Sequence, residues 1–407
     1  MKQGWEITLL KDACKVFADG DWIESKDQSS YGIRLIQTGN IGFGYFKDKE
    51  DKSRYISEET FFRLKCTEIL SGDLLVSRLP DPVGKSCIIP DINSKMITGV
   101  DCTIIRTKDN LSSQFLCYYQ MSNQYLNDVQ SGVSGATRQR ISRKNLGLIK
   151  IPIPPLPEQK RIVAILDEVF SAIAKAKVKA EQNLKNSAAL FESYLQGVFD
   201  NKGEDWEVNI LKEVCELKSG TTISPSLERT EGDVLYTKIG DMNLPDNKVE
   251  INTSSRFVNR NEIKLNQIIP EGAIIFPKRG GAIATNKKRK IVKPTIVDLN
   301  TMAIIPSKKI DNDYFFHWFQ LFDLNSISNG ANIPQINNYS FDEVYIPYPK
   351  SIREQQSIVQ KLDALSLEKN KLEAIYNQKL NDLEELKKSV LQKAFSGELK
   401  TEKVIAR

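Results

Sequence analysis

The sequence has only one histidine, His317, and its six cysteines form no Cys-x-x-Cys pair. Structural zinc sites are usually built from such pairs, so no metal site is expected, and reduced thiols of an intracellular protein are the simpler interpretation. No run approaches the roughly 18 apolar residues of a membrane span. The first residues, Met-Lys-Gln-Gly-Trp, also lack the apolar segment of a signal peptide. We therefore expect a soluble protein of the cytoplasm.

Several catalytic motifs are also missing. The sequence contains no G-x-x-x-x-G-K-[ST] phosphate loop and no Asn/Asp-Pro-Pro-Tyr/Phe motif of an adenine methyltransferase. Gly39, Gly42 and Gly44 are not in the order of a dinucleotide-binding loop, so this segment is interpreted as an ordinary loop. One loose pattern resembles a metal-dependent nuclease, with Asp246 after a proline and Glu262-Ile-Lys264 further on. A proline-aspartate pair is also common in turns, and a nuclease remains an open alternative.

The charges nearly balance: 57 Lys and Arg residues against 52 Asp and Glu residues give a net charge of +5 over 407 residues. A polyanionic partner is compatible with this total but not required by it, so local clusters must decide. The length favours two domains of roughly 150 to 200 residues each, and each of them can bury its own core.

The chain repeats itself. The segment WEITLLKDAC, which begins at Trp5, returns 201 residues later as WEVNILKEVC, which begins at Trp206. Gly135 to Ile141 likewise corresponds to Gly330 to Ile336, and Ile151-Pro-Ile-Pro154 to Ile346-Pro-Tyr-Pro349. This period is far longer than that of a solenoid repeat, so it indicates duplication of a whole domain with pseudo-twofold symmetry.

Each repeat begins with short strand-like runs bounded by Gly, Pro, Asp and Asn, and ends in a long segment without proline. The aromatic stretches 114–125 and 313–322 have helical spacing, with Phe115, Tyr118 and Tyr119 matched to Phe315, Trp318 and Phe319; core packing is their simpler role and base stacking the alternative. We expect an α+β protein with two mixed α/β domains, head 1 (residues 1–155) and head 2 (residues 201–351). Two helical segments, 156–200 and 352–407, follow them.

Apolar residues recur every three or four positions along both long segments, which is typical of a coiled-coil seam. Lys369 and Lys379 interrupt this seam in the second copy. At about 1.5 Å per residue, each helix is on the order of 65 Å long, too long to be covered by one head. We therefore expect the two helices to pair antiparallel within the chain, with the packing positions Leu166, Val169, Ile173, Leu184, Leu362, Leu365, Leu372 and Leu383.

The strip IPIPPLPEQKRIV, from Ile151 to Val163, and the long helix after it resemble the conserved region of Type I restriction-modification specificity subunits. The second copy, from Ile346, resembles it too, although Ile352 and Arg353 replace Pro157 and Glu158. Glu354-Gln355 preserves the Glu-Gln pair, and the resemblance covers essentially the whole chain. The lost proline makes the entry turn of the second helix less rigid.

The resemblance implies a non-catalytic subunit in which each head reads one part of a split site in double-stranded DNA. The paired helices would hold the heads at a fixed distance, with two modification subunits packed around them and restriction subunits joining that core. S-adenosylmethionine would bind the modification subunits and ATP the restriction subunits, so no cofactor is expected on this chain. The complex would work on the DNA of a prokaryotic cell, associated with the nucleoid.

Charge and position suggest which residues contact DNA. Head 1 has a basic loop just before the proline strip, and arginine forks bind phosphates or read guanine edges. Head 2 has amides at the equivalent loop, which are suited to adenine but are also ordinary turn residues, and two basic runs that are suited to phosphates. The candidates are Thr137, Arg138, Gln139, Arg140, Arg143 and Lys144 in head 1, and Lys278, Arg279, Lys287, Lys288, Arg289, Asn332, Gln335 and Asn337 in head 2. Arg34, Arg78 and Lys85 are weaker candidates.

A third class of function remains open from the sequence. A coiled-coil scaffold whose heads bind proteins would have the same repeat and the same helices. Solvated basic loops would then replace the DNA contacts. Binding of DNA by the assembled complex distinguishes the two hypotheses.

Overall fold

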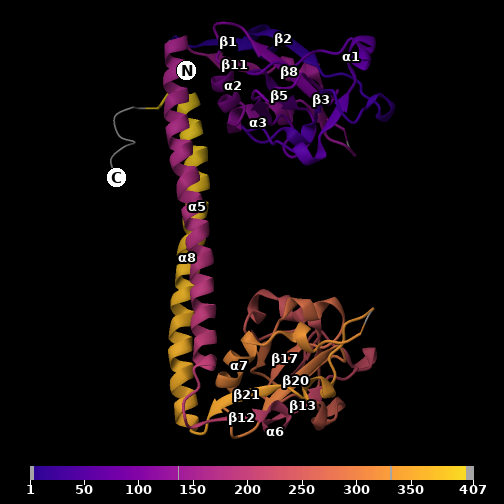
Figure 1. Ribbon diagram of the computed structural model, residues 1–407, viewed down its shortest axis with the longest axis vertical. Helices are drawn as coiled ribbons and strands as arrows, with labels where there is room; N and C mark the ends of the chain where they lie inside the picture. The colour runs from indigo at the N-terminus through magenta and orange to yellow at the C-terminus, as the bar shows by residue number, and fades with distance from the viewer. Residues whose placement is uncertain (1–3, 136, 331, 400–407) are drawn as a thin grey trace. The chain divides into compact units, whose positions relative to one another are not determined.

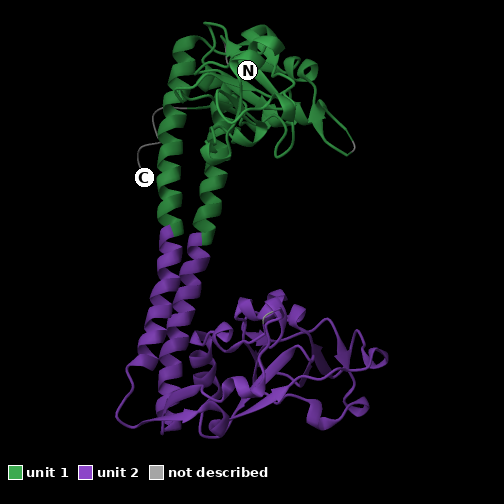
Figure 2. Ribbon diagram, turned by 45° about the vertical axis from the view of Figure 1, so that its right-hand side comes forward, with its two compact units in different colours: residues 1–181, 377–407 green, residues 182–376 purple. Residues whose placement is uncertain are grey.

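The computed structural model describes residues 4–135, 137–330 and 332–399. The chain divides into two compact units (Figure 2). Unit 1 comprises residues 1–181 and 377–407, and unit 2 comprises residues 182–376. Each unit therefore contains one head and one part of each of the two long helices, α5 (Leu156–Asp200) and α8 (Ile352–Ser396).

Head 1 is built on a four-stranded antiparallel sheet and a smaller mixed sheet, with two further strand pairs. The four-stranded sheet has the order β2 (Cys14–Asp19), β8 (Cys102–Thr107), β5 (Leu74–Ser77) and β6 (Ser86–Ile88). The mixed sheet has the order β4 (Arg54–Ile56), β3 (Ile33–Ile36) and β7 (Met96–Thr98). The pairs are β1 (Glu6–Leu9) with β11 (Lys150–Ile153), and β9 (Val133–Ser134) with β10 (Arg140–Ile141).

The short helices of head 1 begin at serine N-caps, whose side chains accept a hydrogen bond from the backbone of the first turn. The helices are α1 (Glu58–Leu64), α2 (Ser113–Tyr119), α3 (Asn123–Ser131) and α4 (Arg143–Gly147). Helices α2 and α3 share one buried core with β5 and β8 and lie close to them in Figure 1.

Head 2 repeats this topology with one additional edge strand, and a single bridge between Asn329 and Gln335 takes the place of the β9–β10 pair. Its larger sheet has the order β13 (Cys215–Ser219), β20 (Thr301–Pro306), β17 (Ile274–Pro277), β18 (Arg289–Ile291) and β15 (Glu250–Ile251). The smaller sheet has the order β16 (Phe257–Val258), β14 (Val234–Thr237) and β19 (Thr295–Val297), and β12 (Trp206–Ile210) pairs with β21 (Tyr345–Pro349). The helices are α6 (Leu211–Val214) and α7 (Asn312–Leu321).

The duplication is visible at the level of single backbone contacts. Gly20 and Gly220 each follow the first strand of the larger sheet, and a Cβ at either position would lie within 2.6 Å of a backbone carbonyl oxygen. The amide of Gly20 donates to Cys102 O and that of Gly220 donates to Thr301 O, both at 2.9 Å. A side chain is therefore excluded at the same place in both heads for the same reason. The predicted internal repeat is confirmed by this shared topology.

The two long helices run antiparallel within each unit, as the seam pattern predicts. In unit 1, Phe170 contacts Lys387 and Lys177 contacts Glu384, so the partner's number falls as the position on α5 rises. In unit 2, Asn183 contacts Tyr376 and Phe191 contacts Lys369 in the same descending order. Figure 1 shows α5 and α8 side by side.

The seam differs from the prediction at two positions. Leu166 and Leu362 are fully buried, and Val169 and Ile173 are less than 9% exposed. Leu184 and Leu383 are half-buried. Leu365 and Leu372, however, remain 40% and 41% exposed and line an open apolar groove of about 270 Å³ in unit 2, together with Leu190, Phe191 and Tyr194. The ammonium of Lys369 lies 5.6 Å from the centroid of the Phe191 ring and pairs with Glu373 at 3.3 Å, so the charge of this lysine has partners at the seam.

Each head packs against the start of one long helix and the end of the other. In unit 1, Ile162 and Leu166 of α5 and Phe395 of α8 belong to the core of head 1. In unit 2, Leu362 of α8 and Phe199 of α5 belong to the core of head 2. Burial of an aromatic ring contributes a few kcal/mol, so these residues make each head and its helix ends one packing unit.

The glutamine of the Glu-Gln pair joins each head to its helix. Gln159 is fully buried. Its Oε1 accepts from Ser112 N at 2.8 Å, and its Nε2 donates to Asn110 O and Pro154 O at 2.8 and 2.7 Å. The side chain thereby satisfies three backbone groups, two of them in the loop before α2.

Gln355 repeats this joint in head 2, so Glu354 is equivalent to Glu158 and Arg353 to Pro157, and the alignment expected from the sequence is wrong by one residue at these two positions. It is also fully buried; its Oε1 accepts from Asp311 N at 2.7 Å, and its Nε2 donates to Lys309 O and Pro349 O at 3.0 and 2.8 Å. Ser112 and Asp311 are therefore equivalent positions, and each is the N-cap of the following helix.

A second contact of the joint corrects the alignment of the aromatic stretches. The hydroxyl of Tyr118 donates to Asp167, and His317 Nε2 lies 2.8 Å from Asp363 Oδ1. Tyr118 is therefore equivalent to His317, and the match to Trp318 predicted from the aromatic pattern is wrong by one residue. The aromatic rings of both stretches are buried in the cores, so the core-packing interpretation holds for them.

Among the described residues, every helix is too short or too polar to span a membrane. All six cysteines are free thiols, and burial raises the pKa of the Cys102 thiol to about 12.

Candidate nucleic-acid interface

Head 1 has a cluster of four arginines and two aspartates at one end of its larger sheet, where β2 and β5 end and β8 begins. Asp19 is the last residue of β2, and Asp101 immediately precedes β8. The arginines lie after β5, in and before β10, and at the start of α4. They are Arg78, Arg138, Arg140 and Arg143. We call these six residues the arginine cluster, and three of them, Arg78, Asp19 and Asp101, lie outside the basic loop that the sequence indicates.

Asp101 holds two guanidinium groups next to each other. Its Oδ2 lies 3.7 Å from Arg138 and its Oδ1 lies 3.4 Å from Arg140. The side chains of Arg138 and Arg140 are 72% and 42% exposed, whereas that of Asp101 is 30% exposed. The less exposed carboxylate therefore orients both guanidinium groups and leaves some of their N–H groups open to solvent.

Asp19 does the same for the other two arginines. Its Oδ1 lies 3.3 Å from Arg78 and its Oδ2 lies 3.4 Å from Arg143. Arg78 is almost fully buried and also donates to Val100 O, so its role is to hold the strand ends together. Arg143 is half-exposed and donates to Phe17 O at 3.2 Å. Four cations against two carboxylates leave the cluster with a net charge of +2.

The other candidates of this loop, Thr137, Gln139 and Lys144, are exposed. Gly135 explains the sharp bend of the loop, since its φ is +105° and a Cβ would lie 2.4 Å from Arg138 O. A side chain is therefore excluded at position 135 of the loop.

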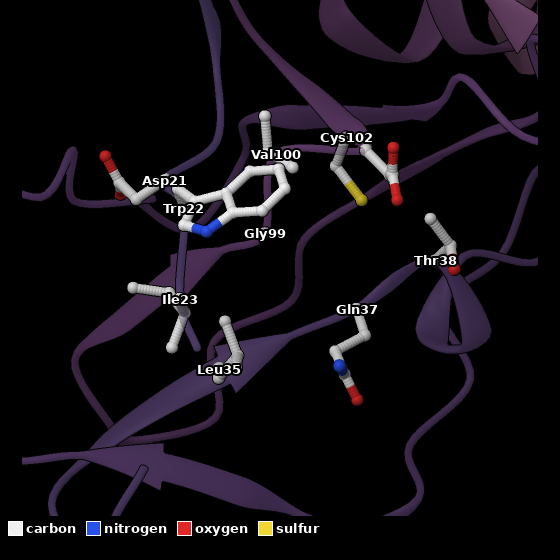
Figure 3. Close-up of a pocket in the computed structure, with 10 residues that line it drawn as sticks. Asp21, Trp22, Ile23, Leu35, Gln37, Thr38, Gly99, Val100 and Cys102 are labelled. Carbon is white, nitrogen blue, oxygen red and sulfur yellow. The ribbon is translucent and has the colours of Figure 1, made fainter. Parts of the chain in front are cut away.

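A pocket of about 220 Å³ adjoins the arginine cluster through Asp101. Figure 3 shows its other lining residues. Trp22 lies on one side of it, and Gln37 and Thr38 lie on the other. Trp22 is 69% exposed, and its indole N–H donates to Glu24 Oε1 at 3.3 Å. An exposed indole beside amide and hydroxyl groups is typical of a recognition surface.

A second, basic pocket of about 300 Å³ shares Leu35, Gln37 and Thr38 with the first. It is lined by the cations Arg34, Lys49, Lys52 and Arg54. The sequence did not indicate this pocket, because three of the cations lie in a run of mixed charge. Arg34 is 7% exposed and paired with Asp48, so the other three are the ones available to an anion.

Head 2 has different side chains at the equivalent positions. The equivalence rests on backbone hydrogen bonds. Ile141 N donates to Arg78 O as Ile336 N donates to Lys278 O, and Arg78 N donates to Asp101 O as Lys278 N donates to Asn300 O. Gly330 has the same positive φ and close approach as Gly135. The equivalent pairs are Asp19 and Ser219, Arg78 and Lys278, Asp101 and Asn300, Arg138 and Ile333, and Arg140 and Gln335.

These residues form a mainly neutral surface in head 2. Lys278 donates to Ser219 Oγ at 3.0 Å in place of the ion pair of head 1. Gln335 Nε2 donates to Asn337 Oδ1 at 3.1 Å, and Asn337 Nδ2 donates to Tyr339 Oη at 3.0 Å. Tyr339 Oη also accepts from Asn329 Nδ2 at 3.2 Å. The ordered amides support the hypothesis of a polar reading surface; Asn332 and Arg279 are exposed beside it.

The basic run 286–290 is largely internal, contrary to the prediction. Lys288 is 1% exposed, and its ammonium donates to Asn286 Oδ1 at 2.9 Å and Phe322 O at 2.5 Å. The guanidinium of Arg289 donates to Asn247 O, Lys288 O and Met242 O. Lys288 is therefore not a DNA contact, because its charge does not reach the surface, and Arg289 is committed to backbone carbonyls. Lys287 is half-buried and bonds to Asn243.

Burial of Lys288 leads to a testable pH dependence. Desolvation lowers its pKa from 10.5 to about 7. The folded protein therefore binds fewer protons than the unfolded chain between pH 7 and 10.5, so this group adds stability as the pH rises through that range. We expect the stability advantage of the wild type over Lys288→Met to increase from pH 7 to 9, with a slope approaching about 1.4 kcal/mol per pH unit. Thermal unfolding of both proteins at both pH values checks this, and parallel pH profiles would contradict it.

The nuclease alternative receives no support from the site geometry. Glu262 pairs with Arg229 at 2.5 Å, and this partner lowers the pKa of the carboxyl. Asp246 belongs to a short 3₁₀ turn, Pro245–Asn247. Within residues 4–135, 137–330 and 332–399, no group of three or more His, Cys, Asp or Glu side chains is placed to hold a metal ion.

Known proteins of one family match this chain over nearly its whole length. The family model described as Type I restriction modification DNA specificity domain matches twice, over residues 2–185 and 203–385. The putative type I restriction enzyme MjaX specificity subunit of Methanocaldococcus jannaschii is 24% identical, over 98% of this chain and 94% of that protein. The type I restriction enzyme EcoKI specificity subunit of Escherichia coli K12 is 23% identical, over 74% of this chain and 68% of that protein.

Solved structures share the fold. A chain from a structure described as the basis of complex assembly and conformational transition of the type I R-M system has a TM-score of 0.82 at 19% identity, covering 98% of this chain and 99% of that one. The crystal structure of the HsdS subunit from Thermoanaerobacter tengcongensis has a TM-score of 0.62 at 18% identity, covering 98% of both chains. With the family model matching both repeats, the chain belongs to the family of Type I restriction-modification DNA specificity subunits.

Proposed function

We propose that this chain is the subunit that selects the DNA sequence for a Type I restriction-modification complex, with each head reading one half of a split site. One observation carries the proposal. Two heads of the same topology present different polar groups at the same strand ends, charged in head 1 and mainly amide in head 2. Two domains that read different DNA sequences are expected to share a backbone fold and to differ in the polar side chains at the same positions.

Two readers on one chain have a physical advantage. One good base contact discriminates by about 1 to 3 kcal/mol, so a single small head selects weakly. Two heads held by the same pair of helices multiply their selectivities, provided that the helices fix the gap between the half-sites. The buried glutamine joints support this role, since they tie each head to its helix through three hydrogen bonds.

The partners follow from the same arrangement. We propose that modification subunits dock on the helices, and that there are two of them because the head and its joint occur twice. The apolar groove beside Leu365 and Leu372 supports a protein partner in unit 2, since open apolar surface of this kind marks interaction sites. Restriction subunits would join the core formed by these proteins.

We further propose that the chain itself is not catalytic. The methyl donor S-adenosylmethionine and ATP would then be bound by the modification and restriction subunits, and this chain would need no cofactor. The complex would act in the cytoplasm of a prokaryotic cell, at the nucleoid, where its DNA substrate lies. The rival hypothesis, a scaffold whose heads bind proteins, predicts that the assembled complex does not bind DNA.

The double variant Arg138→Ala/Arg140→Ala tests the role of the arginine cluster. We expect weaker binding of duplex DNA and a smaller salt dependence, because two exposed guanidiniums are lost, while assembly with the modification subunit is retained. Gel retardation of the assembled complex at two salt concentrations measures both. Lys308→Ala, at an exposed lysine outside the cluster, is the control. Unchanged affinity and site choice in the double variant would remove the loop from the interface.

A further inference from the structure

We propose that one position, occupied by Arg140 in head 1 and by Gln335 in head 2, decides which base each head selects, guanine for head 1 and adenine for head 2. The inference rests on the proposed function and adds the chemistry of the two half-sites. Its basis is the juxtaposition of each of these side chains with a supporting side chain, Asp101 in head 1 and Asn337 in head 2.

The two positions are equivalent in the backbone. Arg140 precedes Ile141 and Gln335 precedes Ile336, and both isoleucines are fully buried. Each isoleucine amide donates to the residue that follows the central strand, Arg78 O at 3.2 Å or Lys278 O at 2.8 Å. The buried, hydrogen-bonded isoleucine fixes the backbone position of the residue before it. Arg140 and Gln335 therefore occupy the same backbone position in the two heads and differ only in their side chains.

In head 1, the supporting carboxylate distinguishes base reading from phosphate binding. A guanidinium that binds phosphate gains nothing from a nearby carboxylate, because the negative charge repels the phosphate. A guanidinium that reads a base gains a fixed orientation. Asp101 lies 3.4 Å from one terminal nitrogen of Arg140, and the side chain is still 42% exposed. Its remaining N–H groups match the two acceptors of guanine, O6 and N7.

In head 2, the amide of Gln335 keeps one donor and one acceptor. One N–H of its Nε2 is used by Asn337 Oδ1, so the second N–H is available. Its Oε1 accepts no hydrogen bond from the described residues and is also available. Adenine presents an acceptor at N7 and a donor at N6 in the major groove, which is the complement of this pair. Asn337 is itself held by Tyr339, so Gln335 is oriented in advance.

The test uses the chain assembled with its modification subunit and duplex DNA carrying the wild-type split site, together with every single base-pair substitution of that site. We expect Arg140→Gln to lose discrimination at one guanine of one half-site, by roughly 5- to 150-fold, the ratio that one bidentate contact provides. Gln335→Arg should lose it at one adenine of the other half-site. Lys144→Gln is the matched control, since an exposed lysine beside the cluster should affect all sequences equally.

The variant Asp101→Asn tests whether Asp101 orients Arg140 or only stabilises the fold of head 1. Head 2 has asparagine at the equivalent position, so the backbone tolerates it, and we expect weaker discrimination at the same base pair as in Arg140→Gln, with unchanged thermal unfolding of the unit. Changes at both half-sites in one variant, or at no position in any variant, would overturn the inference while leaving the proposed function intact. A wild-type complex that recognises no split site would instead overturn the proposed function.

Discussion

Replacing Gln159 with glutamate is expected to lower the melting temperature of unit 1 by roughly 6 to 20 °C. The change puts an acceptor against Asn110 O and Pro154 O, which now receive hydrogen bonds from Nε2. A buried charge without a partner costs about 3 to 5 kcal/mol. In a unit of roughly 200 residues, each kcal/mol corresponds to about 2 to 4 °C.

Hydrogen exchange gives the local readout of this prediction. The amide of Ser112 donates to Gln159 Oε1, and that of Asp311 donates to Gln355 Oε1. In Gln159→Glu, Ser112 should exchange faster while Asp311 keeps its protection, and Gln355→Glu should show the reverse. Gln182→Glu is the control, because the side chain of Gln182 is exposed on the same helix and donates to Asn186 one turn further on. Equal melting temperatures for Gln159→Glu and this control would show that the joint does not hold the head.

The second large effect is expected from Leu365→Pro in α8. Proline in a helix interior removes one backbone hydrogen bond and clashes with the preceding turn, which costs about 3 kcal/mol or more. The site lies where α8 pairs with α5 in unit 2, beside the groove that includes Phe191 and Leu372. We expect loss of assembly with the modification subunit and loss of methylation at the split site.

Leu365→Met is the matched variant for this experiment. Leu365 is 40% exposed and lines the apolar groove, and methionine keeps that apolar surface and leaves the helix continuous. It should assemble and methylate nearly as well as the wild type. Normal methylation by Leu365→Pro would contradict the role of the helices in holding the two readers.

Much of the fold follows from local sequence signals. The long proline-free segments begin at the repeated Glu-Gln motif, and their apolar spacing predicts the pairing that Lys177 and Glu384 show. Details that depend on tertiary contacts do not follow. Matching the aromatic residues alone aligned Tyr118 with Trp318. The helix N-caps, Ser112 and Asp311, set the true alignment, in which Tyr118 corresponds to His317, the partner of Asp363. Leu365 fits the seam spacing and is nevertheless exposed, since it lines an open apolar groove that spacing alone does not indicate.

The candidate site was predictable only where its residues are neighbours in the sequence. Arg138, Arg140 and Arg143 form a visible basic loop, but Asp19 and Asp101 come from two other strands and are brought to it by the sheet. Charge alone was misleading for Lys288, since a cation in a basic run is usually solvated, and this one caps the end of a helix at Phe322 O. Only its burial and its hydrogen-bond partners show that Lys288, unlike the less buried Lys287, does not reach the surface.

The central claim is tested most directly by sequencing the methylome of a host that expresses this chain with its modification subunit. The account predicts adenine methylation at a single split motif with a fixed gap, and the two halves of that motif would be the sites of the two heads. If the complex is assembled and no split motif is methylated, the claim that this chain selects the DNA sequence is contradicted, and the scaffold hypothesis takes its place.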